Sequence, residues 1–239
     1  MPTPRSAAAP VSTAESRTAP AAVLWDMDGT LVDSEPYWMA TERELAHEQG
    51  ATWTDEQALA MVGQEITQTA RSLREQAGVP GTDEEIAERL VNRVADRIRA
   101  NGPPWRPGAR ELLDELSAAG IPSALVTMSY REMAQAVLES LPAGTFAVVV
   151  TGDEVTRGKP HPEPYLTAAR LLDVDIRRCV AIEDSIPGVA SAEASGAATI
   201  AVPLMVDIPP APGRTLLPSL AGVTVADLSR VAAAHLDTH

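Results

Sequence analysis

Side chains with a carboxylate, hydroxyl or ammonium group lie at four separate places in this chain. They are Asp26, Asp28 and Thr30; Thr127 and Ser129; Lys159; and Glu183, Asp184 and Ser185. If these groups meet in one crevice, at least three carboxylates crowd together. Like charges that close are costly unless they are protonated or bridged by a cation. Carboxylate oxygens are hard ligands that suit Mg²⁺, which also takes water and substrate phosphate.

The remaining groups would supply donors for an anion. The Thr127 hydroxyl, the Lys159 ammonium and the backbone amides of the turn at 28–30 all point to an anion site. A metal, a lysine and a hydroxyl that converge on one point are how a transferring phosphoryl group is held. A carboxylate aimed at phosphorus can be the nucleophile, and a second one two residues away can serve as acid and then base. The residue types therefore predict phosphoryl transfer.

The elements that must position these groups are short apolar runs, each typical of a buried strand. They span 21–25, 123–127, 146–150, 179–182 and 198–202. Helical patterns separate the later runs, and strands that alternate with helices predict right-handed βαβ units and a parallel sheet. In such a sheet ligands bind outside the carboxyl ends of the strands, where the polar groups lie. The predicted fold class is α/β, with a Rossmann-like parallel-sheet core.

The long stretch between the first two strands needs more than one crossover helix. It has amphipathic spacing at 37–49, 55–62, 65–77 and 83–99. We interpret it as an inserted α-helical cap over 36–104, between core segments 21–35 and 105–239. Residues 1–20 are predicted to be a disordered tail. Residues 203–222 are predicted to be a proline-rich loop, with a last strand at 223–225 and a terminal helix from Leu228.

Composition excludes several classes of protein. The chain has 239 residues and a formal net charge of −14, with 33 acidic and 19 basic residues. Such an acidic chain is a poor candidate for nucleic-acid binding. One cysteine cannot form an internal disulfide, and no apolar run reaches the ~18 residues of a membrane span. We expect a cytoplasmic location and no nucleic-acid or membrane partner. The sequence leaves the oligomeric state open, and a monomer is the default expectation.

Four motifs in this order resemble those of the haloacid dehalogenase-like hydrolase superfamily. Asp26-Met27-Asp28-Gly29-Thr30 resembles the first motif, and Thr127 with Ser129 the second. Gly158-Lys159-Pro160 resembles the third, and Glu183-Asp184-Ser185 the fourth. The helical insertion after the first motif is similar to the cap of the branch that contains β-phosphoglucomutase and phosphoglycolate phosphatase.

The resemblance implies a role for each residue. Asp26 would be the nucleophile and a Mg²⁺ ligand. Asp28 would be the general acid and base, with its backbone carbonyl on the metal. Asp184 would be the third Mg²⁺ ligand, and Glu183 a neighbour of the metal or an alternative ligand. Thr127 and Lys159 would bind the phosphoryl oxygens, with Lys159 also holding Asp26, and Ser129 would contact phosphate or substrate.

Two neighbouring chemistries of the superfamily fit poorly. The dehalogenases lack the acid at the Asp28 position, and the phosphonate-hydrolysing members need a lysine in the cap. The only lysine here is Lys159, which belongs to the third motif. The leading hypothesis is a Mg²⁺-dependent phosphatase of a small phosphorylated metabolite, acting through an aspartyl-phosphate.

Two alternatives to a phosphatase stay open. A phosphomutase of the β-phosphoglucomutase type is disfavoured because 63–68 lacks basic residues. A catalytically silent binding protein on the same fold is disfavoured by the intact acids. The substrate is also open between sugar phosphates, phosphoglycolate and nucleotide-like esters.

Overall fold

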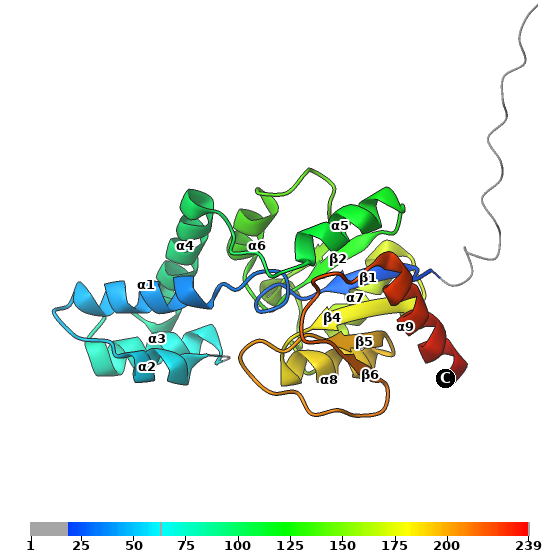
Figure 1. The fold of residues 1–239 in the computed structure, drawn as a ribbon. Helices are drawn as coiled ribbons and strands as arrows, with labels where there is room; N and C mark the ends of the chain where they lie inside the picture. The colour runs from blue at the N-terminus through cyan, green and yellow to red at the C-terminus, as the bar shows by residue number, and fades with distance from the viewer. Residues whose placement is uncertain (1–18, 63, 239) are drawn as a thin grey trace, which may run out of the picture.

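The computed structural model describes residues 19–62 and 64–238. Most of the predicted tail, residues 1–18, lies outside these ranges. The core is a six-stranded sheet in the order β3-β2-β1-β4-β5-β6, in which every neighbouring pair is parallel (Figure 1). The strands are β1 (Ala22–Trp25), β2 (Ser123–Val126), β3 (Val148–Val150), β4 (Cys179–Glu183), β5 (Ala198–Ala201) and β6 (Arg214–Leu216). This confirms the predicted Rossmann-like α/β class.

Helices cover both faces of the sheet, so its central strands are buried on both sides. On one face, Val23 and Trp25 of β1 pack with α5 (Ala109–Ala118), α6 (Arg131–Leu138) and α9 (Val225–Thr238). On the other face, Ala22 and Leu24 pack with α7 (Glu163–Leu172) and α8 (Ile186–Ser195). Successive side chains of a strand point to opposite faces, which explains why the strand reads as a continuous apolar run. Two short 3-10 helices, η2 (Gly152–Glu154) and η3 (Ile176–Arg178), complete the connections.

Four helices follow β1 and precede β2. They are α1 (Glu35–His47), α2 (Asp55–Met61), α3 (Ile66–Ala77) and α4 (Asp83–Asn101). These helices share a separate apolar cluster that includes Trp53, Leu73 and Leu90. Thr82 accepts a hydrogen bond from the Glu85 amide at the start of α4, as its position predicts, and this satisfies one of the open amides of the first turn.

Helix α4 extends from this cluster to the core. Its last turns place Val94 and Ile98 in the apolar cluster on the sheet. Arg99 then binds Glu132 at 2.7 Å and Glu139 at 3.0 Å, at the two ends of α6. In Figure 1 the four helices lie to one side of the sheet, beyond the carboxyl ends of its strands. No helix in the described ranges is long and apolar enough to cross a bilayer.

The end of the chain differs from prediction. The sixth strand is Arg214–Leu216, inside the segment predicted to be loop, and 223–225 is not a strand. Helix α9 begins at Val225, before the predicted start at Leu228. Strand β6 pairs only with β5, is only half-buried and has three residues. Such a short edge strand has no apolar run to distinguish it from the proline-rich loop around it.

Candidate active site

Strand register brings two of the predicted acidic segments side by side. Trp25 of β1 pairs with Ile182 of β4, and the Asp26 amide donates to the Ile182 carbonyl at 3.0 Å. Asp26 therefore lies beside Glu183, the last residue of β4, and Asp184 follows directly after the strand. Oxygen atoms of Asp26, Glu183 and Asp184 all lie within 4.8 Å of one another, and all three side chains are buried.

Electrostatics makes this carboxylate cluster costly without a cation. Burial, together with the charges of Asp26 and Glu183, raises the pKa of Asp184 to about 8. Asp26 Oδ2 is buried and has no hydrogen-bond partner. A buried acceptor without a donor loses its hydration without replacement, and a hard cation would supply what is missing. The donor set of the cluster thus fits a divalent metal ion.

Lys159 is the cationic centre of the site. Its Nζ lies 2.6 Å from Asp26 Oδ1 and 2.6 Å from Glu183 Oε1, and it donates to the Val126 carbonyl at 2.8 Å. These three acceptors match the three N–H groups of an ammonium. Burial alone would lower the pKa of Lys159, but the charges of Asp26 and Glu183 raise it above its ordinary value, so the group stays protonated.

Asp28 has a different environment from Asp26. Its Oδ2 accepts from Ser129 Oγ at 2.6 Å, and its Oδ1 accepts from Ser34 Oγ at 2.5 Å. Burial raises the pKa of Asp28 although these two hydrogen bonds oppose the shift. A carboxyl that binds its proton more tightly than usual is suited to donate it to a leaving group.

The second motif is held close to the first. Thr127 directly follows β2, and its Oγ1 accepts from the Ser129 amide at 3.0 Å. The same Oγ1 lies 3.5 Å from Asp28 Oδ2, so the hydroxyls of both residues face the Asp28 carboxyl. All six predicted site residues are thus brought together: Asp26, Asp28, Thr127, Ser129, Lys159 and Asp184. Their roles stay predictions.

Gly29 explains how the first turn can approach the fourth motif. Its φ is +84°, in the left-handed region that favours glycine. A Cβ at this position would lie 2.0 Å from Asp184 Oδ2. Only a residue without a side chain lets the turn pass so close to Asp184.

Two contacts at the site involve residues that were not predicted to belong to it. Ser34 lies eight residues after Asp26, in the same run that resembles the first motif, but the resemblance gave it no role. Tyr165 of α7 is fully buried, and its hydroxyl donates to Glu183 Oε1 at 2.6 Å. In the sequence it lies in an amphipathic helical pattern, where a tyrosine is more often part of the core.

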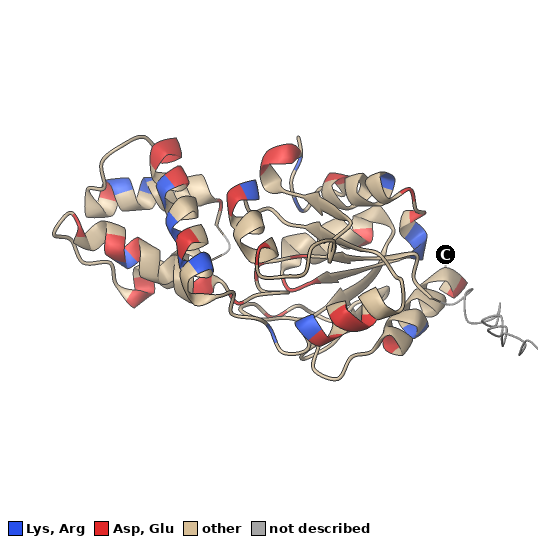
Figure 2. Cartoon of the chain, turned by 90° about the horizontal axis from the view of Figure 1, so that it is seen from above, with Lys and Arg blue, Asp and Glu red and all other residues tan. Residues whose placement is uncertain are grey.

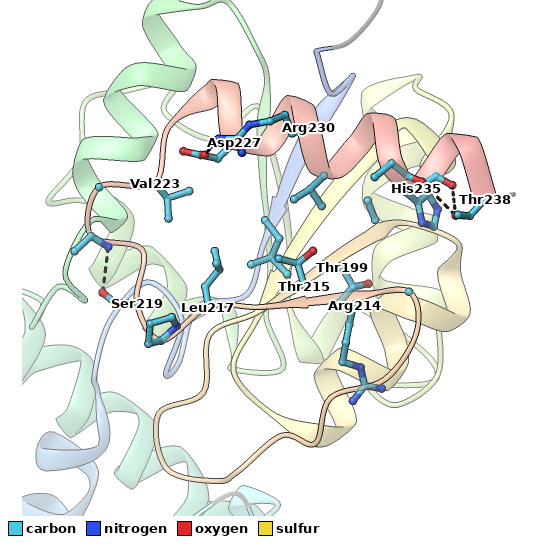
Figure 3. Close-up of a pocket in the computed structure, with 18 residues that line it drawn as sticks. Thr199, Arg214, Thr215, Leu217, Ser219, Val223, Asp227, Arg230, His235 and Thr238 are labelled. Atoms are coloured by element: carbon cyan, nitrogen blue, oxygen red, sulfur yellow. Dashed lines mark hydrogen bonds and ion pairs between the residues drawn. The ribbon is translucent and has the colours of Figure 1, made fainter.

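A separate cavity of about 680 Å³ lies between α9 and the β5–β6 edge of the sheet (Figure 3). Its lining comes from these elements and the loop before α9, and it includes none of the six predicted site residues. The acidic cluster and the lysine therefore belong to a different part of the molecule.

Comparisons with known proteins agree with the geometry. Hexitol phosphatase A of Escherichia coli strain K12 is 36% identical over 188 residues, which cover 78% of this chain and 84% of that protein. A bifunctional riboflavin kinase/FMN phosphatase of Arabidopsis thaliana is 33% identical over 187 residues, 76% of this chain but only 48% of that longer protein. The crystal structure of CbbY from Rhodobacter sphaeroides in complex with phosphate matches with a TM-score of 0.77 at 30% identity, over 87% of this chain and 99% of that one.

The family model described as haloacid dehalogenase-like hydrolase matches residues 23–202, from β1 to just beyond β5. This range contains all four motifs and the carboxylate cluster. The chain belongs to the haloacid dehalogenase-like hydrolase family.

Proposed function

We propose that this chain is a Mg²⁺-dependent phosphatase that hydrolyses the phosphate ester of a small metabolite through an aspartyl-phosphate. The observation that carries the proposal is the pairing of two acids with different environments in one turn. Asp26 is held by Lys159, whereas Asp28 is held by Ser34 and Ser129. The phosphatase relative supports the reaction class.

The two acids would divide the reaction between them. Asp26 attacks phosphorus, and the bond from phosphorus to the leaving oxygen breaks as Asp28 gives that oxygen its proton. Asp28 then takes a proton from water, the resulting hydroxide attacks the phosphorus of the aspartyl-phosphate, and phosphate leaves Asp26. Thr127 and Ser129 hydroxyls and nearby backbone amides would hold the phosphoryl oxygens.

Mg²⁺ would be held by the Asp26 and Asp184 carboxylates together with the Asp28 backbone carbonyl. When bound, it would neutralise the phosphoryl oxygens and the crowded acids. Glu183 is a poorer ligand, because its Oε1 already faces Lys159 and Tyr165 and its Oε2 lies 3.3 Å from Ser185 Oγ.

The cap over 36–104 would close on the site and select the substrate. The seven arginines in this segment have partners: six bind carboxylates, and Arg89 donates to the Pro80 carbonyl. Figure 2 shows these basic positions interleaved with acidic ones along the helices. No arginine in the described part of the cap is left to grip a second phosphate, which favours a phosphatase over a phosphomutase.

The surroundings of Asp28 also favour a neutral leaving group. Glu35 directly follows Ser34, the residue that holds Asp28. Burial, together with the charges of Asp28 and Asp33, raises the pKa of Glu35 to about 7. The Glu35 carboxylate would repel an anionic leaving group, whereas it could accept hydrogen bonds from the hydroxyls of a sugar or polyol. The preferred substrates are therefore sugar or polyol monophosphates rather than phosphoglycolate.

A phosphate-release assay with Mg²⁺ tests the proposal. The panel contains sorbitol 6-phosphate, glucose 6-phosphate, phosphoglycolate, fructose 1,6-bisphosphate and p-nitrophenyl phosphate. Hydrolysis of the first two at the highest kcat/KM, lost with a chelator and in Asp26→Asn, is the expected result. No turnover of any ester would point to a silent binding protein.

A single-turnover assay separates the remaining alternative. A phosphatase releases inorganic phosphate as its phosphoenzyme decays. An isomerised sugar phosphate with a slowly decaying phosphoenzyme would identify a phosphomutase instead.

A further inference from the structure

Tyr165 lies on α7 and packs on one face of the sheet, with Leu24 of β1 and Ala181 of β4. Its side chain has no exposed surface, and its hydroxyl donates to Glu183 Oε1 at 2.6 Å. Lys159 Nζ contacts the same Oε1 and also lies 5.3 Å from the centre of the Tyr165 ring. The phenol therefore contacts both members of the Glu183–Lys159 pair.

Glu183 itself has little freedom to move. It is fully buried, and its Oε2 lies 3.3 Å from Ser185 Oγ. A Cβ at Gly188 would fall 1.9 Å from Oε2, so the carboxylate packs directly on the backbone of α8. Its orientation is thus set by Tyr165 on one oxygen and by α8 on the other.

The Tyr165 hydroxyl can act only as a donor to this carboxylate. Burial raises the pKa of Tyr165 well above its ordinary value, with the charge of Glu183 adding to the shift, so the phenol keeps its proton. The contacts form one continuous line, from Tyr165 to Glu183, from Glu183 to Lys159, and from Lys159 to Asp26 Oδ1.

We propose that Tyr165 is a positioning residue for the nucleophile. Its hydroxyl fixes Glu183, Glu183 fixes the Lys159 ammonium, and the ammonium holds Asp26 in the orientation from which it attacks. The proposal rests on the proposed function of Asp26. The ring alone fills the apolar cluster under the sheet, so a phenylalanine would satisfy the packing and remove only the positioning contact.

The test compares Tyr165→Phe with Tyr37→Phe. The Tyr37 hydroxyl also donates one hydrogen bond, but to the Gly102 carbonyl at 3.0 Å, and only the Tyr37 backbone, which the substitution keeps, bonds to Ser34. With p-nitrophenyl phosphate, Tyr165→Phe should lower kcat about tenfold, the order expected for one hydrogen bond to a buried charge, and leave KM within about twofold. Tyr37→Phe should change neither constant, and the midpoint of thermal unfolding should confirm that both variants fold.

A second readout does not depend on turnover. Lys159 is the only lysine in the chain, so a tag-free protein labelled with ¹⁵N-lysine gives one Nζ resonance. Tyr165→Phe should shift this resonance and speed the exchange of its protons with water, and Glu183→Gln should also shift it. Tyr37→Phe should leave it in place.

The two readouts keep the failures apart. A parental kcat in Tyr165→Phe, an equal loss in Tyr37→Phe, or an unmoved Nζ resonance would overturn the positioning role. If the parent protein hydrolyses no ester, the proposed function fails, and the Nζ resonance still reports whether Tyr165 holds the Glu183–Lys159 pair.

Discussion

Lys159 Nζ lies 2.6 Å from Asp26 Oδ1 although 133 residues separate the two in the chain. The lysine side chain is only 5% exposed and that of Asp26 only 10%. A buried ion pair gives little net stability, but removal of one partner leaves an uncompensated charge. Here the loss would leave two carboxylates, Asp26 and Glu183, without their common cation.

Lys159→Met should therefore lower both stability and activity. We expect the free energy of unfolding to fall by about 3 kcal/mol in urea denaturation at pH 7, and hydrolysis of p-nitrophenyl phosphate to become undetectable. Arg43→Met is the matched control, because Arg43 binds Asp55 on the surface of the cap. Such an exposed pair contributes less than about 1 kcal/mol. Equal losses in the two variants would contradict a special role for the buried pair.

Asp28→Asn should separate the two halves of the proposed reaction. The p-nitrophenolate leaving group needs no proton, so Asp26 is still phosphorylated, whereas hydrolysis of the phosphoenzyme loses its base and slows by about 100-fold or more. Intact-protein mass spectrometry should then detect one added phosphoryl group. With an alkyl phosphate, the first step is slowed as well.

The double variant Asp26→Asn/Asp28→Asn is the control for this result, and it should carry no phosphoryl group. Parental turnover of an alkyl ester by Asp28→Asn would show that another residue supplies the proton.

The arrangement of the site was predictable where it depends on strand ends. Asp26, Thr127 and Asp184 each follow a short apolar run, and the carboxyl ends of parallel strands meet at one edge of a sheet. Lys159 follows no strand, and its sequence position alone could not place it. Lys159 became a candidate because it lies in the third motif and is the only lysine. The structure then places its Nζ within hydrogen-bond distance of Asp26.

Other features depend on tertiary packing that a sequence does not encode locally. The sequence predicts that Tyr165 is a core residue of a helix, and only the folded structure shows that its hydroxyl contacts Glu183. Arg71 and Arg74 lie one turn apart on α3, and only the fold shows that both bind Asp83 at the start of α4. Strand β6 forms because β5 offers it a pairing partner, rather than because its own residues favour a strand.

Gly29→Ala should weaken metal binding because the new methyl group would collide with Asp184. We expect the Mg²⁺ concentration for half-maximal activity to rise at least about tenfold, and the Mg²⁺-dependent rise in unfolding temperature to be lost. Gly50→Ala is a control for the general effect of an alanine at a positive φ, because Gly50 has a φ of +71° and nothing lies within 4 Å of its Cβ position. A similar loss of Mg²⁺ affinity in both variants would contradict a local collision with Asp184.

Glu42 in the cap should make the protein less stable as pH rises. It is buried, its Oε2 accepts from Trp53 Nε1 at 3.0 Å, and burial raises its pKa to about 7. Between its unfolded pKa of about 4.5 and about pH 7 the folded state binds the extra proton, so its contribution to stability falls over this window and stays low above it. Glu42→Gln keeps an acceptor for Trp53 and removes the charge.

The Glu42→Gln variant should therefore match the parent near pH 4.5 and exceed it at pH 8, by up to about 3 kcal/mol. Urea denaturation at the two pH values measures the difference. Glu88→Gln, an exposed change on α4, should give the same small difference at both. If Glu42→Gln were no more stable than the parent at pH 8, Glu42 would not have the raised pKa on which the prediction rests.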